Sequence, residues 1–351
     1  MNKALHTKSI IHLNWSLDMG GIETMLVNIA NAQAAMGCDV HIVVVNRHYD
    51  HSLIQRIDPA VRLVLLNRRP GSRGILPLIR LNAYLMRHRD AVIHCHVGSL
   101  IGIIARPFHR RCCLTRHSVS SQEDQKKRLR RYRKVFAISE AVKQDIWQKY
   151  QVPSVVIPNG IVTNDIEKRA YRHIDKDSAI RMVSVGRILL SVKGQDILCK
   201  AVALLKAYKI VLDIIGDGPD MDRLRQLCRE LGLSDSVRLM GRRTPDYLSS
   251  HLRDYDLFVL PSLTEGFGLS VAEAMAAMLP VVVSDIEGPG EIVCGGRFGH
   301  LFKAGDVGEC ASAIQNVIEN YDTEASLDKA YRHVVESYDV KQTARLYLEQ
   351  Y

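Results

Sequence analysis

The stretch that decides the fold runs from Leu257-Phe258-Val259-Leu260 into Thr264-Glu265-Gly266-Phe267-Gly268-Leu269-Ser270-Val271-Ala272-Glu273-Ala274-Met275. Its apolar start predicts a buried strand, its glycines a tight loop and its end a helix. A helix entered through glycines exposes unpaired N–H groups and a positive dipole end, which suits phosphate. Glu265 lies in the loop and Glu273 about two helical turns on. One carboxylate could therefore face a sugar and the other a ribose.

The same pattern of a short apolar run followed by a helical segment recurs along the whole chain. Continuous apolar strands that alternate with helices are typical of a parallel sheet covered on both faces. The runs lie at residues 10–13, 40–45, 61–66, 92–95, 112–115 and 135–138, and then at 182–185, 210–215, 237–239, 257–260 and 281–284. The sequence therefore predicts an α/β protein with two Rossmann-like, doubly wound parallel-sheet domains.

The length of 351 residues is sufficient for two such domains. Residues 164–178 are polar and lack apolar periodicity, so we place the linker there. We expect one domain over residues 1–165, a second over 166–338, and a C-terminal helix over 339–351 that could pack back on the first domain. Ligands of open α/β sheets bind outside the carboxyl ends of the strands, so we expect the two sheets to face each other across a cleft.

Composition narrows the class of protein. The chain is 47% hydrophobic and 24% charged, which is typical of a globular protein. Its eight cysteines show no metal-ligand spacing and are expected to be reduced thiols. The apolar run over residues 10–15 is too short for a signal-peptide core or a membrane span. We therefore expect a cytoplasmic protein, which could lie peripherally on the inner face of the cytoplasmic membrane.

Charge is divided unequally along the chain. Residues 1–165 hold 24 Lys and Arg against 11 Asp and Glu, and the remainder holds 23 against 27. A basic N-terminal half suggests an anionic acceptor, an anionic membrane surface or nucleic acid, and the absence of a nucleic-acid-binding motif argues against the last. The basic run at residues 125–134 is either a solvated face or a contact with lipid or a phosphorylated acceptor. Arg68, Arg69, Arg73, Arg110 and Arg111 could join it.

A second informative segment lies between the first predicted strand of the second domain and its first helix. It runs from Val185-Gly186-Arg187 to Lys193-Gly194-Gln195-Asp196. Arg187 and Lys193 leave the carboxyl end of one strand together, where two cations could neutralise a diphosphate.

These segments resemble the family-4 glycosyltransferases, also called glycosyl transferases group 1, which are retaining enzymes of the GT-B fold. The family signature is a pair of glutamates separated by seven residues with Gly-Phe-Gly after the first, as in Glu265 and Glu273 here. The resemblance implies that Glu265 holds the hydroxyls of the donor sugar and that Glu273 holds those of the ribose. It also implies that Arg187 and Lys193 stabilise the leaving nucleoside diphosphate.

The resemblance extends to further positions. It implies that the loop at Gly20 and Gly21, after Met19, approaches the donor phosphate, and that His117 faces the sugar from the other domain. The nucleotide base would lie near Gly241 and Arg243, with Glu291 in a supporting role. The donor-binding loop would comprise Gly266, Phe267, Gly268 and Leu269.

No metal site and no cofactor are expected. His94 and His96 flank Cys95 at a strand end, but no third ligand follows at a useful spacing, so packing and hydrogen bonding explain them. Asp254-Tyr255-Asp256 superficially resembles a metal-binding Asp-x-Asp, yet it immediately precedes a predicted buried strand, and we expect Asp256 to be structural.

The residues and the resemblance together imply a metal-independent, retaining glycosyltransferase of the hexosyltransferase type, with Glu265, His117, Arg187 and Lys193 in catalytic roles. The nucleotide-sugar, UDP- or GDP-linked, is a co-substrate, and the acceptor is a glycan or glycolipid. Lipopolysaccharide, capsule or exopolysaccharide assembly in a bacterium would fit. A sugar-nucleotide epimerase of the same fold and an inactive carbohydrate-binding relative are the alternatives. A dinucleotide dehydrogenase is excluded because no Gly-x-Gly-x-x-Gly follows the first strand.

Overall fold

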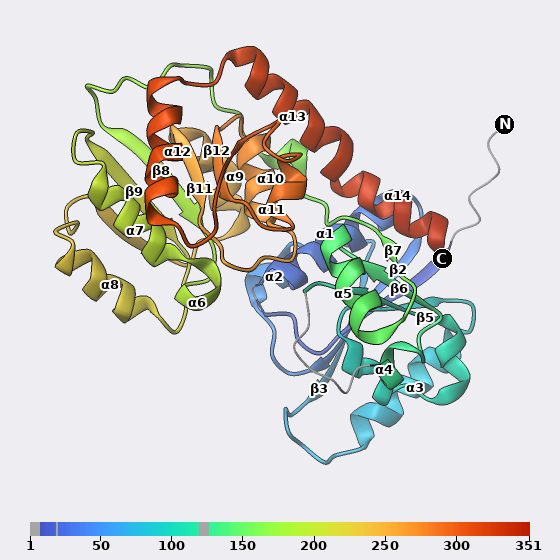
Figure 1. The fold of residues 1–351 in the computed structure, drawn as a ribbon. Helices are drawn as coiled ribbons and strands as arrows, with labels where there is room; N and C mark the ends of the chain where they lie inside the picture. The colour runs from blue at the N-terminus through green and yellow to red at the C-terminus, as the bar shows by residue number, and fades with distance from the viewer. Residues whose placement is uncertain (1–7, 19, 119–125) are drawn as a thin grey trace. The chain divides into compact units, whose positions relative to one another are not determined.

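The computed structural model describes residues 8–18, 20–118 and 126–351, and these form two compact α/β units. The chain passes from the first unit to the second between Ile161 and Val162, and it returns to the first between Asp339 and Val340. Each unit is built on its own parallel sheet (Figure 1). The predicted class, two doubly wound parallel-sheet α/β domains, is confirmed.

The first unit contains a seven-stranded sheet in the order β3-β2-β1-β4-β5-β6-β7. Its strands are β1 (Ser9–Asn14), β2 (Asp39–Asn46), β3 (Arg62–Arg68), β4 (Val92–Cys95), β5 (Cys112–Arg116), β6 (Lys134–Ala137) and β7 (Val155–Val156). Its helices are α1 (Gly21–Ala35), α2 (His51–Gln55), α3 (Leu76–Arg87), α4 (Lys126–Leu129), α5 (Glu140–Tyr150) and α14 (Val340–Gln350), with 3₁₀ segments η1 (Gly98–Gly102) and η2 (Arg106–Arg111).

The second unit contains a six-stranded sheet in the order β10-β9-β8-β11-β12-β13. Its strands are β8 (Ile180–Val185), β9 (Ile210–Ile215), β10 (Val237–Gly241), β11 (Leu257–Leu260), β12 (Val281–Ser284) and β13 (His300–Phe302). Its helices are α6 (Leu190–Lys193), α7 (Gln195–Leu204), α8 (Met221–Glu230), α9 (Pro245–His251), α10 (Leu269–Ala276), α11 (Pro289–Ile292), α12 (Val307–Glu319) and α13 (Glu324–Tyr338), with 3₁₀ segments η4 (Thr163–Asp165) and η5 (Leu252–Asp254).

The strand order of each sheet reverses once, between β1 and β4 in the first unit and between β8 and β11 in the second. Because crossovers between parallel strands are right-handed, this reversal puts helices on both faces of a sheet. In the second unit α7 and α12 lie side by side on one face, and α10 and α13 lie side by side on the other (Figure 1). The strands are buried from both sides, which explains their continuous apolar runs.

The last helix, α14, packs within the first unit. The Val340 N–H donates to the Ile161 carbonyl (2.9 Å) where the chain returns to this unit. A Cβ added at Gly160 would lie 2.5 Å from the Cα of Val340, so the approach depends on glycine. Tyr347 is fully buried, and its hydroxyl is 2.9 Å from Oγ1 of Thr115 on β5. The helix therefore contributes to the core of the first unit.

The polar segment at residues 164–178 belongs to the second unit rather than running free between units. Arg169 is buried, and its guanidinium donates to the Tyr321 hydroxyl (2.7 Å) and to a carboxylate oxygen of Asp256 (3.0 Å). Asp256 also accepts from Arg172 and from the Arg181 backbone N–H. Its carboxylate thus anchors this segment to the start of β8 and β11, which is the structural role expected for it.

Candidate functional site

The strongest cluster of predicted site residues lies where the strand order of the second sheet reverses. Arg187 follows β8 and Glu265 follows β11, and these strands are neighbours, with Val183 paired to Phe258. The carboxyl ends of parallel strands meet at one edge, so the two following loops meet there too. The Leu263 N–H donates to the Val192 carbonyl (2.8 Å), and the Thr264 N–H donates to the same oxygen (3.1 Å). The loops after β8 and β11 are therefore joined by backbone hydrogen bonds.

Gly194, between α6 and α7, allows the two loops to come this close. Its φ is +62°, in the left-handed region, and a Cβ there would lie 2.1 Å from the Pro261 carbonyl oxygen. A residue with a side chain would both be strained and push the loops apart. The glycine after Lys193 is thus a requirement of the local geometry.

The joined loops hold an ion pair. Nζ of Lys193 contacts Oε2 of Glu265, and the two side chains are 21% and 18% exposed. The Lys193 side chain lies next to Gly186. A Cβ added at Gly186 would be 4.0 Å from Cδ of Lys193. Arg187 is exposed, and its carbonyl accepts from the buried Gln195 side chain (2.9 Å). The structure therefore places Arg187, Lys193 and Glu265 together at one edge of the sheet.

Helix α10 begins at this edge. Gly268 precedes it with a φ of +101°, and no side chain among the described residues caps its first N–H groups. The Ser270 hydroxyl donates to the Val185 carbonyl (3.3 Å), which ties the first turn to the end of β8. Because the glycines form a loop up to Gly268, Glu273 lies about one turn into the helix, not two as expected.

The rest of the glycine loop packs against neighbouring residues of the second unit. Phe267 is buried, and its ring meets the edge of Tyr338 (centroids 5.4 Å apart). Gly288, with a φ of +87°, lies so close that a Cβ there would be 3.0 Å from the Phe267 backbone N. Gly288 is followed by α11, which carries the half-buried Glu291. The loop that carries the partly buried Glu265 thus rests on a packed support.

The positions expected for the nucleotide base lie at the end of β10. Gly241 ends the strand with a φ of +66°, and its carbonyl accepts from the Gly216 N–H (2.9 Å). The exposed Arg243 guanidinium lies over the ring of Tyr247, 5.3 Å from its centroid. Tyr247, which lies in the first turn of α9 four residues after Arg243, was not among the predicted site residues.

The remaining predicted site residues lie in the first unit. Gly20 precedes α1 and Gly21 is its first residue, whereas Met19 lies outside the described residues. A Cβ on Gly20 would lie 2.7 Å from the carboxylate of Glu23, whose pKa is raised by burial. His117 follows β5, and its Nε2 is 3.3 Å from Nδ1 of His96. Burial, with a smaller contribution from Arg116, lowers the pKa of His117 to about 3, so its imidazole is neutral at pH 7.

The structure sets a third histidine beside His94 and His96, although none follows them at a useful spacing along the chain. The parallel pairing of β1 with β4 sets His12 opposite His94. All three histidines are buried, and ring nitrogens of the three lie within 4.8 Å of one another. Spacing along the chain could not show this group, because the register of the sheet creates it.

The comparisons with known proteins agree with this architecture. Residues 165–334 match the family model described as glycosyl transferases group 1, and residues 19–165 match the model described as glycosyltransferase family 4. The structure of HepE from Anabaena, in complex with UDP and glucose, is similar over 98% of this chain and 99% of that chain, with a TM-score of 0.80 and 24% identity. This likeness shows the fold, the two-domain GT-B class.

Two curated relatives match part of the chain. The sulfoquinovosyl transferase SQD2 of Arabidopsis thaliana is 33% identical over 174 residues, which are 48% of this chain and 33% of the relative. A D-inositol 3-phosphate glycosyltransferase of Catenulispora acidiphila is 33% identical over 168 residues, 44% of this chain and 39% of the relative. The chain thus spans less than half of the length of these relatives. With both family models matched, it belongs to the family-4 glycosyltransferases.

Proposed function

We propose that the chain is a retaining, metal-independent glycosyltransferase that moves a hexose from a nucleotide-sugar to a glycan or glycolipid acceptor. The observation that carries the proposal is the Lys193–Glu265 pair on two hydrogen-bonded loops at the carboxyl edge of the second sheet. A diphosphate needs cations and N–H groups, and a sugar needs a carboxylate acceptor. This edge supplies all of them from β8, β11 and the start of α10.

In the proposed mechanism the donor diphosphate competes with Glu265 for Lys193. Arg187, Lys193 and the N–H groups after Gly268 then stabilise the charge that develops on the leaving diphosphate, which is the main electrostatic contribution. Glu265 turns to the hydroxyls of the sugar, and Glu273 holds the ribose. The acceptor hydroxyl attacks the sugar and passes its proton to the leaving phosphate.

The relatives support a nucleotide-sugar donor without deciding which nucleotide or which sugar it carries. HepE binds UDP and glucose, and the Arabidopsis relative transfers sulfoquinovose. The exposed Arg243 after β10 and the half-buried Tyr247 in α9 are proposed neighbours of the base of a UDP- or GDP-linked hexose. Bacterial lipopolysaccharide, capsule or exopolysaccharide assembly is the proposed setting, and a structural relative that is a lipopolysaccharide outer core galactosyltransferase is consistent with it.

Product analysis tests this function. UDP-, GDP- and ADP-sugars are first screened by thermal shift, because a ligand at 100 to 1,000 times its Kd adds about 2.7 to 4.1 kcal/mol of stability. With the donor that binds, we expect transfer at full rate in excess EDTA and a product with the anomeric configuration of the donor, read by NMR.

The two parts of this prediction fail separately. Activity abolished by EDTA and restored by manganese would contradict the assignment of the diphosphate to Arg187 and Lys193, since a metal would then hold it. An inverted product would contradict the retaining mechanism. Release of a free sugar without transfer would favour the epimerase alternative.

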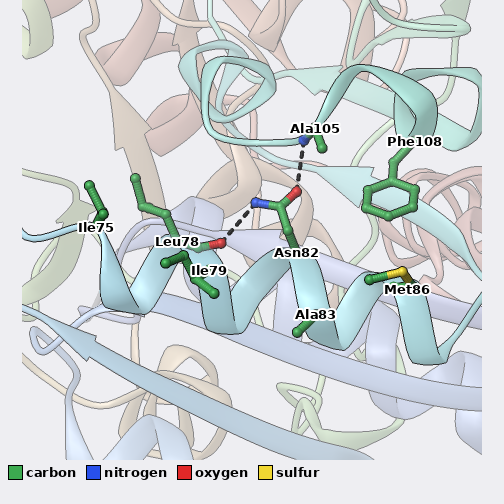
Figure 2. A pocket seen from close by; sticks show the side chains of 8 residues that line it. All are labelled: Ile75, Leu78, Ile79, Asn82, Ala83, Met86, Ala105 and Phe108. Atoms are coloured by element: carbon green, nitrogen blue, oxygen red, sulfur yellow. Dashed lines mark hydrogen bonds between the residues drawn. The ribbon is translucent and has the colours of Figure 1, made fainter.

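We further propose that the first unit contacts an anionic membrane surface, on the inner face of the cytoplasmic membrane, through α3. Figure 2 shows an open groove between α3 and the segment at Ala105 and Phe108, with apolar side chains along the helix. Ile75 is 66% exposed and Ile79 is 56% exposed. Leu76 and Met86 add exposed apolar surface to the same helix. Among the described helices, none is long and apolar enough to cross a bilayer.

The charged side chains in the segments that form this surface are all arginines. Residues 69–89 and 105–111 contain no Asp or Glu. Exposed arginines occur in or next to the two segments that form the groove, at positions Arg73, Arg80, Arg87, Arg106 and Arg110. Apolar side chains bordered by arginines are suited to the headgroup and acyl boundary of an anionic membrane. Asn82 fixes the groove by accepting from the Ala105 N–H (2.7 Å) (Figure 2).

Several other basic residues have structural partners instead. Arg111 donates to the carbonyls of Leu85, His88 and Ala91 and so binds the C-terminal end of α3. Lys134 donates to the Gln350 carbonyl (2.6 Å) at the end of α14. The basic run at 125–134, described from residue 126 on, is therefore partly committed to packing. We place the proposed membrane contact on α3, where exposed apolar side chains accompany the arginines.

Vesicle sedimentation tests the membrane contact. We expect binding to phosphatidylglycerol vesicles that falls steeply as salt rises, because exposed charges are screened. Ile79→Gln and Arg80→Gln should each weaken it. Leu204→Gln is the matched control, since Leu204 is 63% exposed in the second unit. Binding that is indifferent to salt and to both α3 variants would contradict the proposal, as would equal loss in the control.

A further inference from the structure

The loop after β8, which carries Arg187, is bound on one side to the loop after the neighbouring strand β9. The Ile188 N–H donates to the Asp217 carbonyl (3.0 Å). The Leu190 N–H donates to a carboxylate oxygen of Asp220 (2.8 Å). The backbone that follows Arg187 is therefore fixed to the next strand of the second sheet.

The carbonyl of Arg187 itself is bound by a side chain of the helix that follows. Gln195 is the first residue of α7 and is only 2% exposed. Nε2 of Gln195 lies 2.9 Å from the Arg187 carbonyl oxygen. A carbonyl oxygen only accepts hydrogen bonds, so the nitrogen of the amide must be the atom that faces it. The chemistry of the partner thus determines which way this amide is turned.

The other polar atom of Gln195 has no partner. Its Oε1 is buried and accepts no hydrogen bond from the described part of the chain. An unpaired buried acceptor destabilises the folded state, and a leucine of similar size would not carry that cost. Polar side chains that are kept at such a cost are typical of functional sites.

The position of Gln195 connects the two cations proposed to bind the diphosphate. Lys193 precedes it by two residues, and its backbone N–H donates to the Leu189 carbonyl (2.7 Å). Gly194 joins Lys193 to the start of α7 in a left-handed conformation that leaves little room for adjustment. The Gln195 amide then links this start of α7 to the backbone of Arg187. One hydrogen bond therefore limits how far the two cations can move apart.

We propose that Gln195 is a positioning residue that sets the spacing of Arg187 and Lys193 for binding of the diphosphate. The identity of the ligand rests on the proposed function, whereas the hold on the Arg187 backbone does not. Arg187 is exposed and has a long side chain, so a fixed backbone reduces the conformational entropy that binding removes. Loss of the Gln195 amide should weaken diphosphate binding without unfolding the second unit.

Hydrogen exchange of the protein without ligand tests the hold on the loop. In Gln195→Leu we expect the amides of Ile188 and Leu190 to exchange about 10-fold faster, which corresponds to the loss of about one hydrogen bond. Exchange over residues 242–244 should not change. The urea midpoint should stay nearly constant, because the variant removes one unpaired acceptor and creates another. Gln226→Leu, at an exposed position of α8, is the matched control and should change neither quantity.

Calorimetric titration of UDP and GDP in EDTA tests the effect on binding. Gln195→Leu should bind the accepted diphosphate about 10-fold more weakly than wild type. Arg187→Gln should weaken binding in the wild-type background but have little further effect in Gln195→Leu, because Arg187 is already misplaced there. Such coupling separates positioning from a general loosening of the unit, for which the two losses would add.

Gln195→Glu gives an independent readout through pH. A protonated carboxyl can donate to the Arg187 carbonyl, an ionised one cannot, and burial raises the pKa of the introduced group. Its affinity for the diphosphate, relative to wild type at the same pH, should be nearly kept at about pH 5 and should fall toward about pH 8. Adding Arg187→Gln should remove this pH dependence. A negative charge that acted directly on the diphosphate would leave it in place.

Unchanged hydrogen exchange of the loop in Gln195→Leu, or additive losses of affinity in the two single variants, would overturn the inference. So would a pH dependence of Gln195→Glu that persists without Arg187. Faster exchange in Gln195→Leu together with a wild type that binds neither UDP nor GDP would instead contradict the proposed function and leave the hold on Arg187 standing.

Discussion

Glu265→Gln is expected to fold normally and to lose most of its turnover, by about 10² to 10³-fold. Glu265 is placed by the loop after β11, and its carboxylate contacts Lys193 at the edge where the donor is proposed to bind. An amide neither attracts the ammonium group nor accepts sugar hydroxyls with both of its polar atoms. Initial rates with the accepted donor measure the effect.

Stability should change little in this variant. Both side chains of the pair are partly exposed, and such ion pairs contribute about 0 to 1 kcal/mol. Urea unfolding of wild type and variant checks this. Glu287→Gln, at an exposed position after β12 in the same unit, is the matched control and should retain full activity. A wild-type rate for Glu265→Gln with any accepted donor would remove the role assigned to Glu265.

Gly194→Ala is expected to destabilise the second unit strongly and to abolish donor binding. A left-handed conformation costs alanine about 1 to 2 kcal/mol, and the Cβ would also lie 2.1 Å from the Pro261 carbonyl oxygen. The chain must relieve that contact by separating the loops that carry Lys193 and Glu265. Together we expect a loss of about 3 kcal/mol or more in the free energy of unfolding.

Gly232→Ala separates the cost of the left-handed conformation from the cost of the close contact between the loops. Gly232 has a φ of +69°, close to the +62° of Gly194, but an added Cβ there would meet no atom within 4 Å. This control should lose only about 1 to 2 kcal/mol and bind the donor normally. Equal losses of stability in the two variants, with donor binding preserved in both, would show that the close approach of the loops does not matter.

The fold could be predicted largely because its strands are continuous apolar runs. Leu257–Leu260 and Val281–Ser284 are buried on both faces and were recognisable from composition alone. β13 was missed because His300–Phe302 has only one fully buried residue. The glycine loop before α10 was predicted, but Glu273 lies about one turn into the helix and not two, because the helix begins only after Gly268.

The residues of the candidate site could be predicted from the sequence, but the contacts between them could not. Lys193 and Glu265 stood out through their motifs, yet their pairing follows from backbone hydrogen bonds between distant loops. The position of His12 beside His94 depends on sheet register, which composition does not encode directly. Arg111 was grouped with surface cations, although it binds the end of α3, because a charge run does not reveal its partners.

The most direct test of the central claim, that the second unit holds the sugar through Glu265 and the diphosphate through Lys193 and Arg187, is calorimetric titration in EDTA. The accepted nucleotide-sugar and its nucleoside diphosphate are each titrated into wild type and Glu265→Gln. We predict that wild type binds both ligands. The variant should bind the diphosphate at least as well, because Lys193 is released, and should lose affinity for the nucleotide-sugar. An equal loss of affinity for both ligands, or no binding of the diphosphate without a metal, would contradict the claim.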